Sequence, residues 1–119
     1  MNEQEFKERT RKLALRVIRL VESLPKTPSA QVVGRQLLRS GTSIGANHRA
    51  ACRARSKADF ISKMGVVEEE ADETIYWTEL LAEAGIIERE RLSSLTKETE
   101  EILSMVVASS KTLKKGRPR

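Results

Sequence analysis

The sequence contains few of the residues that build disulfide scaffolds, β-rich folds or membrane spans. Its 119 residues include one cysteine, one histidine, three prolines, six glycines and only 3% aromatic residues. A single cysteine excludes an internal disulfide. Low proline, glycine and aromatic content, with 33% charged residues, favours helices over a sheet sandwich. No apolar run reaches the roughly 18 residues that a membrane-spanning helix requires.

The start of the chain lacks the pattern of a secretory signal peptide, so we expect a cytoplasmic location. At 119 residues, the chain is long enough for one domain with a core and too short for two. Motifs for nucleotide binding are also missing, because the sequence contains neither a Walker loop nor a dinucleotide fingerprint, and it has no zinc knuckle. We therefore expect no cofactor and no small-molecule substrate.

Apolar residues recur at every third or fourth position along four segments, which predicts four helices. The expected helices cover about residues 3–24, 28–54, 57–84 and 88–113. Pro25 ends the first, Thr27 caps the second, and Ser56 with Asp59 resembles a capping box at the start of the third. Gly85 provides a C-terminal stop for the third helix.

The expected fold is therefore all-α, an antiparallel up-down-up-down four-helix bundle with short loops. Residues 1–113 form its single domain. The last residues, 114–119, form a basic segment broken by glycine and proline, which predicts a flexible tail.

Charge is unevenly distributed along the chain. The formal net charge is +5, but residues 1–60 carry 13 basic and 5 acidic side chains, whereas residues 61–101 carry 4 and 12. Residues 102–119 carry 5 basic side chains and no acidic one. Two interpretations stay open: neighbouring helices or subunits neutralise one another, or a basic surface binds an anionic partner.

The second predicted helix has two different faces. Its packing seam consists of Val33, Leu37, Ser40, Ile44, Asn47 and Ala51. A register about 200 degrees away round the helix consists of Arg35, Arg39, Thr42, Ala46, Arg49 and Arg53. Small residues between these positions let a neighbouring backbone approach closely. The helix thus predicts one packing face and one basic face.

Three motifs, Arg39–Asn47 (RSGTSIGAN), Arg53–Phe60 (RARSKADF) and Glu70–Trp77 (EADETIYW), resemble the bacterial four-helix-bundle family of 23S rRNA intervening-sequence proteins, also called S23 proteins. The resemblance spans roughly residues 17–113. It implies a ring-like homopentamer, similar to the accessory protein of diversity-generating retroelements, which binds a reverse transcriptase and nucleic acid. Two positions depart from the family pattern: Ala50 stands where a glutamate is common, and His48 where an aromatic or aliphatic residue is common.

The acidic run at residues 68–73 raises the possibility of a carboxylate metal site inside the bundle. Di-iron bundles combine such carboxylates with Glu-x-x-His pairs, and the sequence has none. We therefore expect no metal, and salt bridges from this run to Arg49, Arg53 or another subunit. Glu70 and Glu73 need cationic partners because like charges at helical spacing repel. We also expect Glu73 to pair with Trp77.

His48 and Cys52 are four residues apart on one helix, a spacing that could suggest nucleophilic catalysis. No orienting group or nucleophile elbow accompanies them. We expect a small thiol at the core edge and an imidazole at the surface or at an interface. Asn47, in the seam, is expected to fix helix register through a hydrogen bond.

The basic face is the feature that bears on function. Arg35, Arg39, Arg49 and Arg53 have the spacing that phosphate binding requires. The packing or interface set is Ser40, Ile44, Asn47, Glu70, Glu73 and Trp77. We predict a non-enzymatic oligomeric adapter that binds RNA, or a ribonucleoprotein or reverse-transcriptase-type partner. The alternative is a purely structural or protein-binding oligomer with the arginines between subunits.

Overall fold

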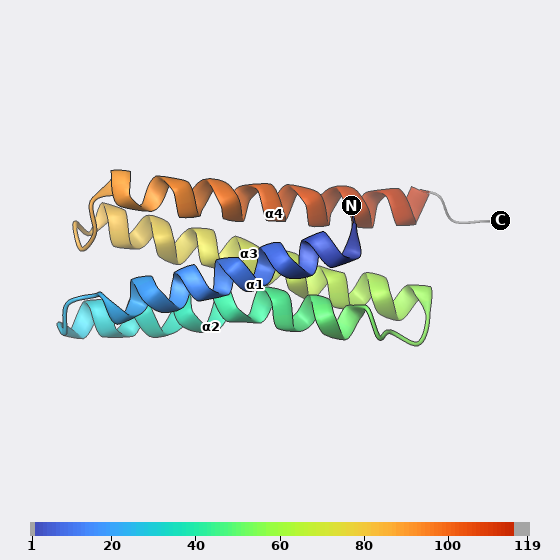
Figure 1. Cartoon of the computed structure of the whole chain (residues 1–119), viewed down its shortest axis with the longest axis horizontal. Coiled ribbons are helices and arrows are strands. Elements are labelled where there is room, and N and C mark those ends of the chain that lie inside the picture. Colours follow the sequence, from blue (N-terminus) through green and yellow to red (C-terminus); the bar gives the residue numbers. More distant parts are fainter. Residues whose placement is uncertain (1, 116–119) are drawn as a thin grey trace.

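Four antiparallel helices make up the protein (Figure 1). The computed structural model describes residues 2–115. The helices are α1 (Glu3–Glu22), α2 (Pro28–Ala51), α3 (Lys57–Glu83) and α4 (Arg89–Lys115). Each helix packs against the next in sequence, and α1 also meets α4, in the least extensive of the four contacts. The fold class predicted from periodicity, an all-α up-down-up-down bundle, is confirmed.

Polar side chains start the first three helices. Asn2 Oδ1 accepts hydrogen bonds from the backbone N–H groups of Gln4 and Glu5 at 2.8 and 3.1 Å. Thr27 accepts from the backbone of Ala30 at 3.3 Å, and Ser56 accepts from Asp59 at 3.0 Å. Such caps satisfy N–H groups that have no partner within a helix. The caps expected at Thr27 and Ser56 are therefore present.

The helix ends differ from the expected ones by a few residues. Helix α1 ends at Glu22 and α2 ends at Ala51, two and three residues earlier than expected. In both cases the chain continues into tighter turns, where a backbone N–H bonds the carbonyl three residues before it, as from Ala54 to Ala51. Helix α4 runs through Lys115, so the predicted tail is helical at its first two residues. Its remainder, 116–119, lies outside the described residues.

The core is apolar with a few buried hydroxyl groups. Its largest fully buried side chains include Phe6, Leu13, Leu37, Ile44 and Met64. Buried threonines on α3 and α4 bond carbonyls of their own helix, as Thr78 does to Thr74 at 2.7 Å. Within the described chain, no helix is long and apolar enough to cross a membrane.

Helices α1 and α2 approach most closely at glycines of α2. A Cβ atom placed on Gly41 would lie 2.8 Å from Cγ2 of Val17, and one on Gly45 would lie 3.0 Å from Oγ1 of Thr10. Real Cβ atoms essentially never come within 3.0 Å of such neighbours. Glycine at Gly41 therefore sets the distance between the two helices.

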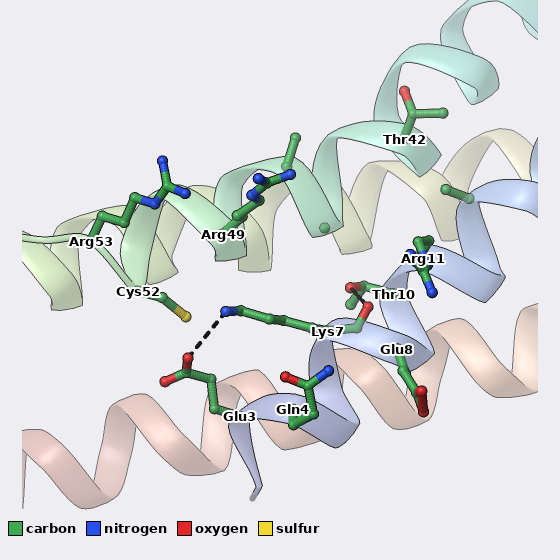
Figure 2. A pocket seen from close by; sticks show the side chains of 13 residues that line it. Glu3, Gln4, Lys7, Glu8, Thr10, Arg11, Thr42, Arg49, Cys52 and Arg53 are labelled. Atoms are coloured by element: carbon green, nitrogen blue, oxygen red, sulfur yellow. Dashed lines mark hydrogen bonds and ion pairs between the residues drawn. The ribbon is translucent and has the colours of Figure 1, made fainter.

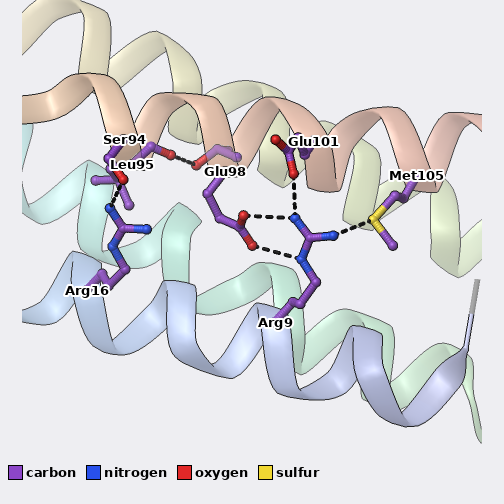
Figure 3. Close-up of polar contacts among 8 residues, drawn as sticks. Arg9, Arg16, Ser94, Leu95, Glu98, Glu101 and Met105 are labelled. Carbon is purple, nitrogen blue, oxygen red and sulfur yellow. Dashed lines mark hydrogen bonds and ion pairs between the residues drawn. The ribbon is translucent and has the colours of Figure 1, made fainter.

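Helices α1 and α4 are joined by a polar cluster rather than by extensive packing (Figure 3). The Arg9 guanidinium bonds both carboxylate oxygens of Glu98, at 2.8 and 2.9 Å, and one oxygen of Glu101 at 2.9 Å. These hydrogen bonds, first those to Glu98, raise the pKa of Arg9. The cluster holds the N-terminal half of α1 beside α4.

Candidate nucleic-acid interface

The four arginines of the predicted basic face are all exposed, three on α2 and Arg53 in the turn that directly follows it. Arg35 and Arg39 form one pair four residues apart, and Arg49 and Arg53 form another. Among the side chains that the structure describes, none of the four takes part in an ion pair. In the single chain, the basic face is therefore open and uncompensated by salt bridges.

A groove of about 540 Å³ lies between the N-terminal half of α1 and the C-terminal half of α2 with the turn after it (Figure 2). Helix α1 contributes Lys7 and Arg11, and the other side contributes Arg49 and Arg53. The remaining lining residues are acidic, small or uncharged: Glu3, Gln4, Glu8, Thr10, Ala14, Thr42, Gly45, Ala46 and Cys52. One half of the predicted basic face, Arg49 and Arg53, thus lines the same groove as the cations of α1. The other half, Arg35 and Arg39, lies outside the groove.

The shape of this groove follows from how α1 crosses α2. The two helices lie close at Gly41, and the N-terminal part of α1 then leans toward α4, to which Arg9 binds it (Figure 1). The helices are still close at Gly45, where a Cβ atom would lie 3.0 Å from Oγ1 of Thr10, and the groove beside this contact is also lined by the small side chain of Ala46. Lys7 and Arg11 were not predicted as site residues, because they join Arg49 and Arg53 only where α1 and α2 meet in the folded chain.

Charge in the groove is predominantly positive. Four basic side chains face two acidic ones, Glu3 and Glu8. Glu3 is bound to Lys7, with a distance of 3.2 Å between Nζ and Oε2. Since these two compensate each other, the uncompensated cations are Arg11, Arg49 and Arg53, against Glu8 alone.

His48 lies in the core, which corrects the expected surface or interface position. Its side chain is 3% exposed, and its ring meets the ring of Phe6 edge-to-face, with centroids 4.5 Å apart. Position 48 follows Ile44 by four residues and precedes Ala51 by three, so it shares their side of α2. The packing seam therefore runs through His48.

Burial lowers the pKa of His48 from its ordinary value of 6.5, and nearby Glu3 and Lys7 act in opposite directions with smaller effect. The unfolded chain thus takes up the proton more readily, and stability must fall as pH drops below 6.5.

We expect the His48→Leu variant to lack this fall in the free energy of unfolding at low pH. Urea unfolding of both proteins between pH 7 and pH 5 measures it, and equal slopes would contradict a neutral buried imidazole.

Cys52 lines the groove beside His48, with Sγ 3.6 Å from Nε2. Burial raises the pKa of the thiol, whereas a nucleophilic cysteine requires a lowered one. Among the described residues, no group of three or more His, Cys, Asp or Glu side chains is placed to hold a metal ion. The pair is thus explained by packing.

Among the described residues, Asn47 forms no hydrogen bond to another helix, contrary to expectation. Its amide donates to the carbonyl of Ser43 in its own helix at 2.8 Å. The buried polar link between α2 and α3 is formed by Ser40 and Thr74, whose hydroxyl oxygens lie 3.0 Å apart and share a hydrogen bond. Ser40 is therefore the residue of the predicted seam that ties α2 to α3, while Ile44 is a fully buried core residue.

The acidic run of α3 forms none of the expected salt bridges to Arg49 or Arg53 among the described residues, and salt bridges to another subunit stay a prediction. Within residues 2–114, neither Glu70 nor Glu73 forms an ion pair. Burial first, and then the charge of Glu73, raise the pKa of Glu70, while Arg39 opposes the shift through its charge. Arg39 is therefore close enough to act on Glu70 without direct contact.

The expected pair of Glu73 and Trp77 has no hydrogen bond between its side chains in the described part of the chain. The indole N–H of Trp77 is buried and has no hydrogen-bond partner in the described part of the chain. Its ring instead meets that of Tyr76 edge-to-face, with centroids 4.9 Å apart. Glu73 itself is exposed. Trp77 therefore acts through apolar packing, partly against the core.

Comparison with known proteins identifies the family. The sequence profile of the 23S rRNA-intervening sequence proteins matches residues 2–108. A solved structure from Bacteroides thetaiotaomicron VPI-5482, described as a protein with unknown function from the S23 ribosomal protein family, is 40% identical. The similarity covers 90% of this chain and 99% of that chain, with a TM-score of 0.85. No curated protein gives a significant match. The resemblance drawn from the three motifs is confirmed, and the chain belongs to the family of 23S rRNA-intervening sequence proteins.

Proposed function

We propose that this protein is a non-enzymatic, cytoplasmic, oligomeric adapter that binds RNA through the basic surface of its helical bundle. The RNA is either free or part of a ribonucleoprotein, such as a complex with a reverse-transcriptase-type protein. The observation that carries the proposal is the exposure of Arg35, Arg39, Arg49 and Arg53 along one segment, without ion pairs among the described side chains. Exposed cations with such spacing attract the phosphates of a nucleic-acid backbone.

Binding of this kind reads the backbone rather than the bases. The chain has four aromatic residues, and none lies on the exposed surface of α1 or α2: Phe6 is buried, and the others, Phe60, Tyr76 and Trp77, belong to α3. Single-strand binders stack bases on exposed aromatic rings. This surface instead suits structured RNA, recognised through its shape and its phosphates.

The family resemblance implies a pentamer, and repetition would strengthen a weak site. One arginine face offers a few phosphate contacts, each with a small contribution in water. Several copies held in one assembly would bind the same RNA together, so the second contact becomes intramolecular. We therefore propose a homo-oligomer, a pentamer by resemblance, in which avidity produces the useful affinity.

The direct test is a titration of nuclease-treated protein with a structured RNA over a salt series. With about four cationic side chains in contact with phosphates, raising the salt from about 50 to about 200 mM should lower the affinity roughly 100-fold. Light scattering on the same sample gives the number of subunits. Absence of binding at low salt, by protein of intact oligomeric mass, would refute the proposal.

One observation favours the alternative of a purely structural or protein-binding oligomer. The exposed acidic residues of α3, among them Glu69, Asp72 and Glu73, are without ion-pair partners inside the described chain, as are the arginines of the basic face. Opposite faces of this kind can meet between two copies. The arginines would then hold subunits together, and their removal would reduce the oligomeric mass.

A further inference from the structure

We propose that the RNA backbone binds in the groove between α1 and α2 rather than along the whole arginine face. Phosphates would lie between Arg11 on α1 and Arg49 and Arg53 at the end of α2. This inference rests on the proposed function and goes beyond it, because it places the ligand between two helices and separates the four arginines into two unequal pairs.

The first argument is that positively charged side chains line both sides of the groove. Arg49 and Arg53 lie four residues apart on one side of the groove, and Arg11 lies on the other (Figure 2). None of these three guanidinium groups has an ion-pair partner among the described residues. A guanidinium can donate two parallel hydrogen bonds to a phosphate. A concave site lined by one sign of charge also concentrates the field more than a convex helix face does.

The second argument is the difference between the two arginine pairs. Arg35 and Arg39 lie outside the groove, and the charge of Arg39 acts on the Glu70 carboxyl group. A nearby carboxylate reduces the potential that Arg39 offers to a phosphate. In the groove, Glu3 is already bound to Lys7, which leaves Glu8 as the remaining acidic side chain. The pair inside the groove is therefore the stronger phosphate site.

The third argument concerns the kind of ligand. Four cationic side chains line the groove, and no aromatic side chain does. Pockets for small organic molecules are predominantly apolar and aromatic. The groove has a volume of about 540 Å³, and cations line it from both helices. A phosphodiester chain therefore fits the lining better than an isolated organic ligand.

The test compares two variants that lose the same charge from the same basic face. We expect Arg49→Gln/Arg53→Gln to bind an RNA hairpin at least 10-fold more weakly than the parent, and Arg35→Gln/Arg39→Gln less than 3-fold more weakly. A second pair tests shape without changing charge. Ala46→Leu adds bulk to the lining of the groove and should weaken binding, whereas Ala50→Leu, at an exposed position outside the groove, should not.

Cys52 offers an independent readout, because it is the only cysteine of the chain and lines the groove. At mildly alkaline pH, RNA should slow its alkylation by a maleimide. Inorganic phosphate at equal phosphate concentration should not, and equal protection by phosphate would indicate a single-anion pocket and overturn the proposal. Protection of Cys52 that increases with protein concentration in the absence of RNA would also overturn the proposal, because it would place another subunit in the groove.

The two levels of inference fail in different ways. Suppose that the parent binds RNA, that the two arginine pairs contribute equally to affinity, and that RNA does not slow the alkylation of Cys52. The RNA then binds outside the groove, and the adapter function stands. If the parent binds no RNA at all, then the proposed function itself is wrong.

Discussion

Gly41→Ala is expected to destabilise the bundle by about 2 kcal/mol, although alanine is the better helix former. The added Cβ atom would lie 2.8 and 2.9 Å from the two methyl groups of Val17 and 3.1 Å from its Cβ. Valine in a helix has one strongly preferred rotamer, so its side chain cannot turn away. Helix α1 must therefore move outward, and packing along the α1–α2 contact is lost.

Urea unfolding followed by circular dichroism measures this effect, and two controls isolate its cause. A methyl group added at Gly65, inside α3, would have nothing within 4 Å, so Gly65→Ala should stabilise the protein by up to about 1 kcal/mol. In a Val17→Ala background, Gly41→Ala should destabilise much less, because the two clashing methyl groups are absent and only the contact with Cβ, at 3.1 Å, remains. A similar loss in both backgrounds would contradict the contact with Val17.

Changing Arg35, Arg39, Arg49 and Arg53 together to glutamine is expected to lower the affinity for structured RNA at least 10-fold at low salt. All four side chains are exposed, and none forms an ion pair within the described chain, so folding should be almost unaffected. The dependence of affinity on salt should also become shallower, because fewer counterions are released. Titrations at several salt concentrations measure both quantities.

Oligomeric mass decides how a loss of binding is interpreted. If light scattering gives the same mass for parent and variant, then the arginines act on the RNA. If the variant dissociates into smaller species, the arginines act between subunits, where the exposed acidic residues of α3 are their natural partners. A variant with unchanged mass, unchanged affinity and unchanged salt dependence would contradict both roles.

Much of the fold could be predicted from local information. Four helices follow from apolar spacing, and Thr27 and Ser56 cap the second and third as their positions suggest. The exposure of the four arginines also follows from spacing, because their register lies almost opposite the buried one. The predicted C-terminal ends of the first two helices were less accurate. There the backbone N–H groups bond the carbonyl three residues earlier, and no particular residue type signals this change.

Local sequence information could not decide which residue of the α2 packing seam is buried after Ile44. Positions three and four residues after Ile44 both lie on its side of the helix, at about 60 and 40 degrees from it. Asn47 and His48 are therefore equally good candidates from sequence. Packing of α1 against the side that contains Gly41 and Gly45 buries His48 against Phe6 and leaves Asn47 at the edge.

The sequence by itself determined the helices, their caps, the family and the outward direction of the arginines, because each depends on neighbours within a few residues along the chain. Only the tertiary structure decided which arginines share a groove and which acidic residues lack a partner. Those properties depend on how α1 crosses α2, close at Gly41 and tied to α4 by Arg9 at its N-terminal half. A crossing angle is set by contacts between residues far apart in sequence, which helical periodicity does not encode.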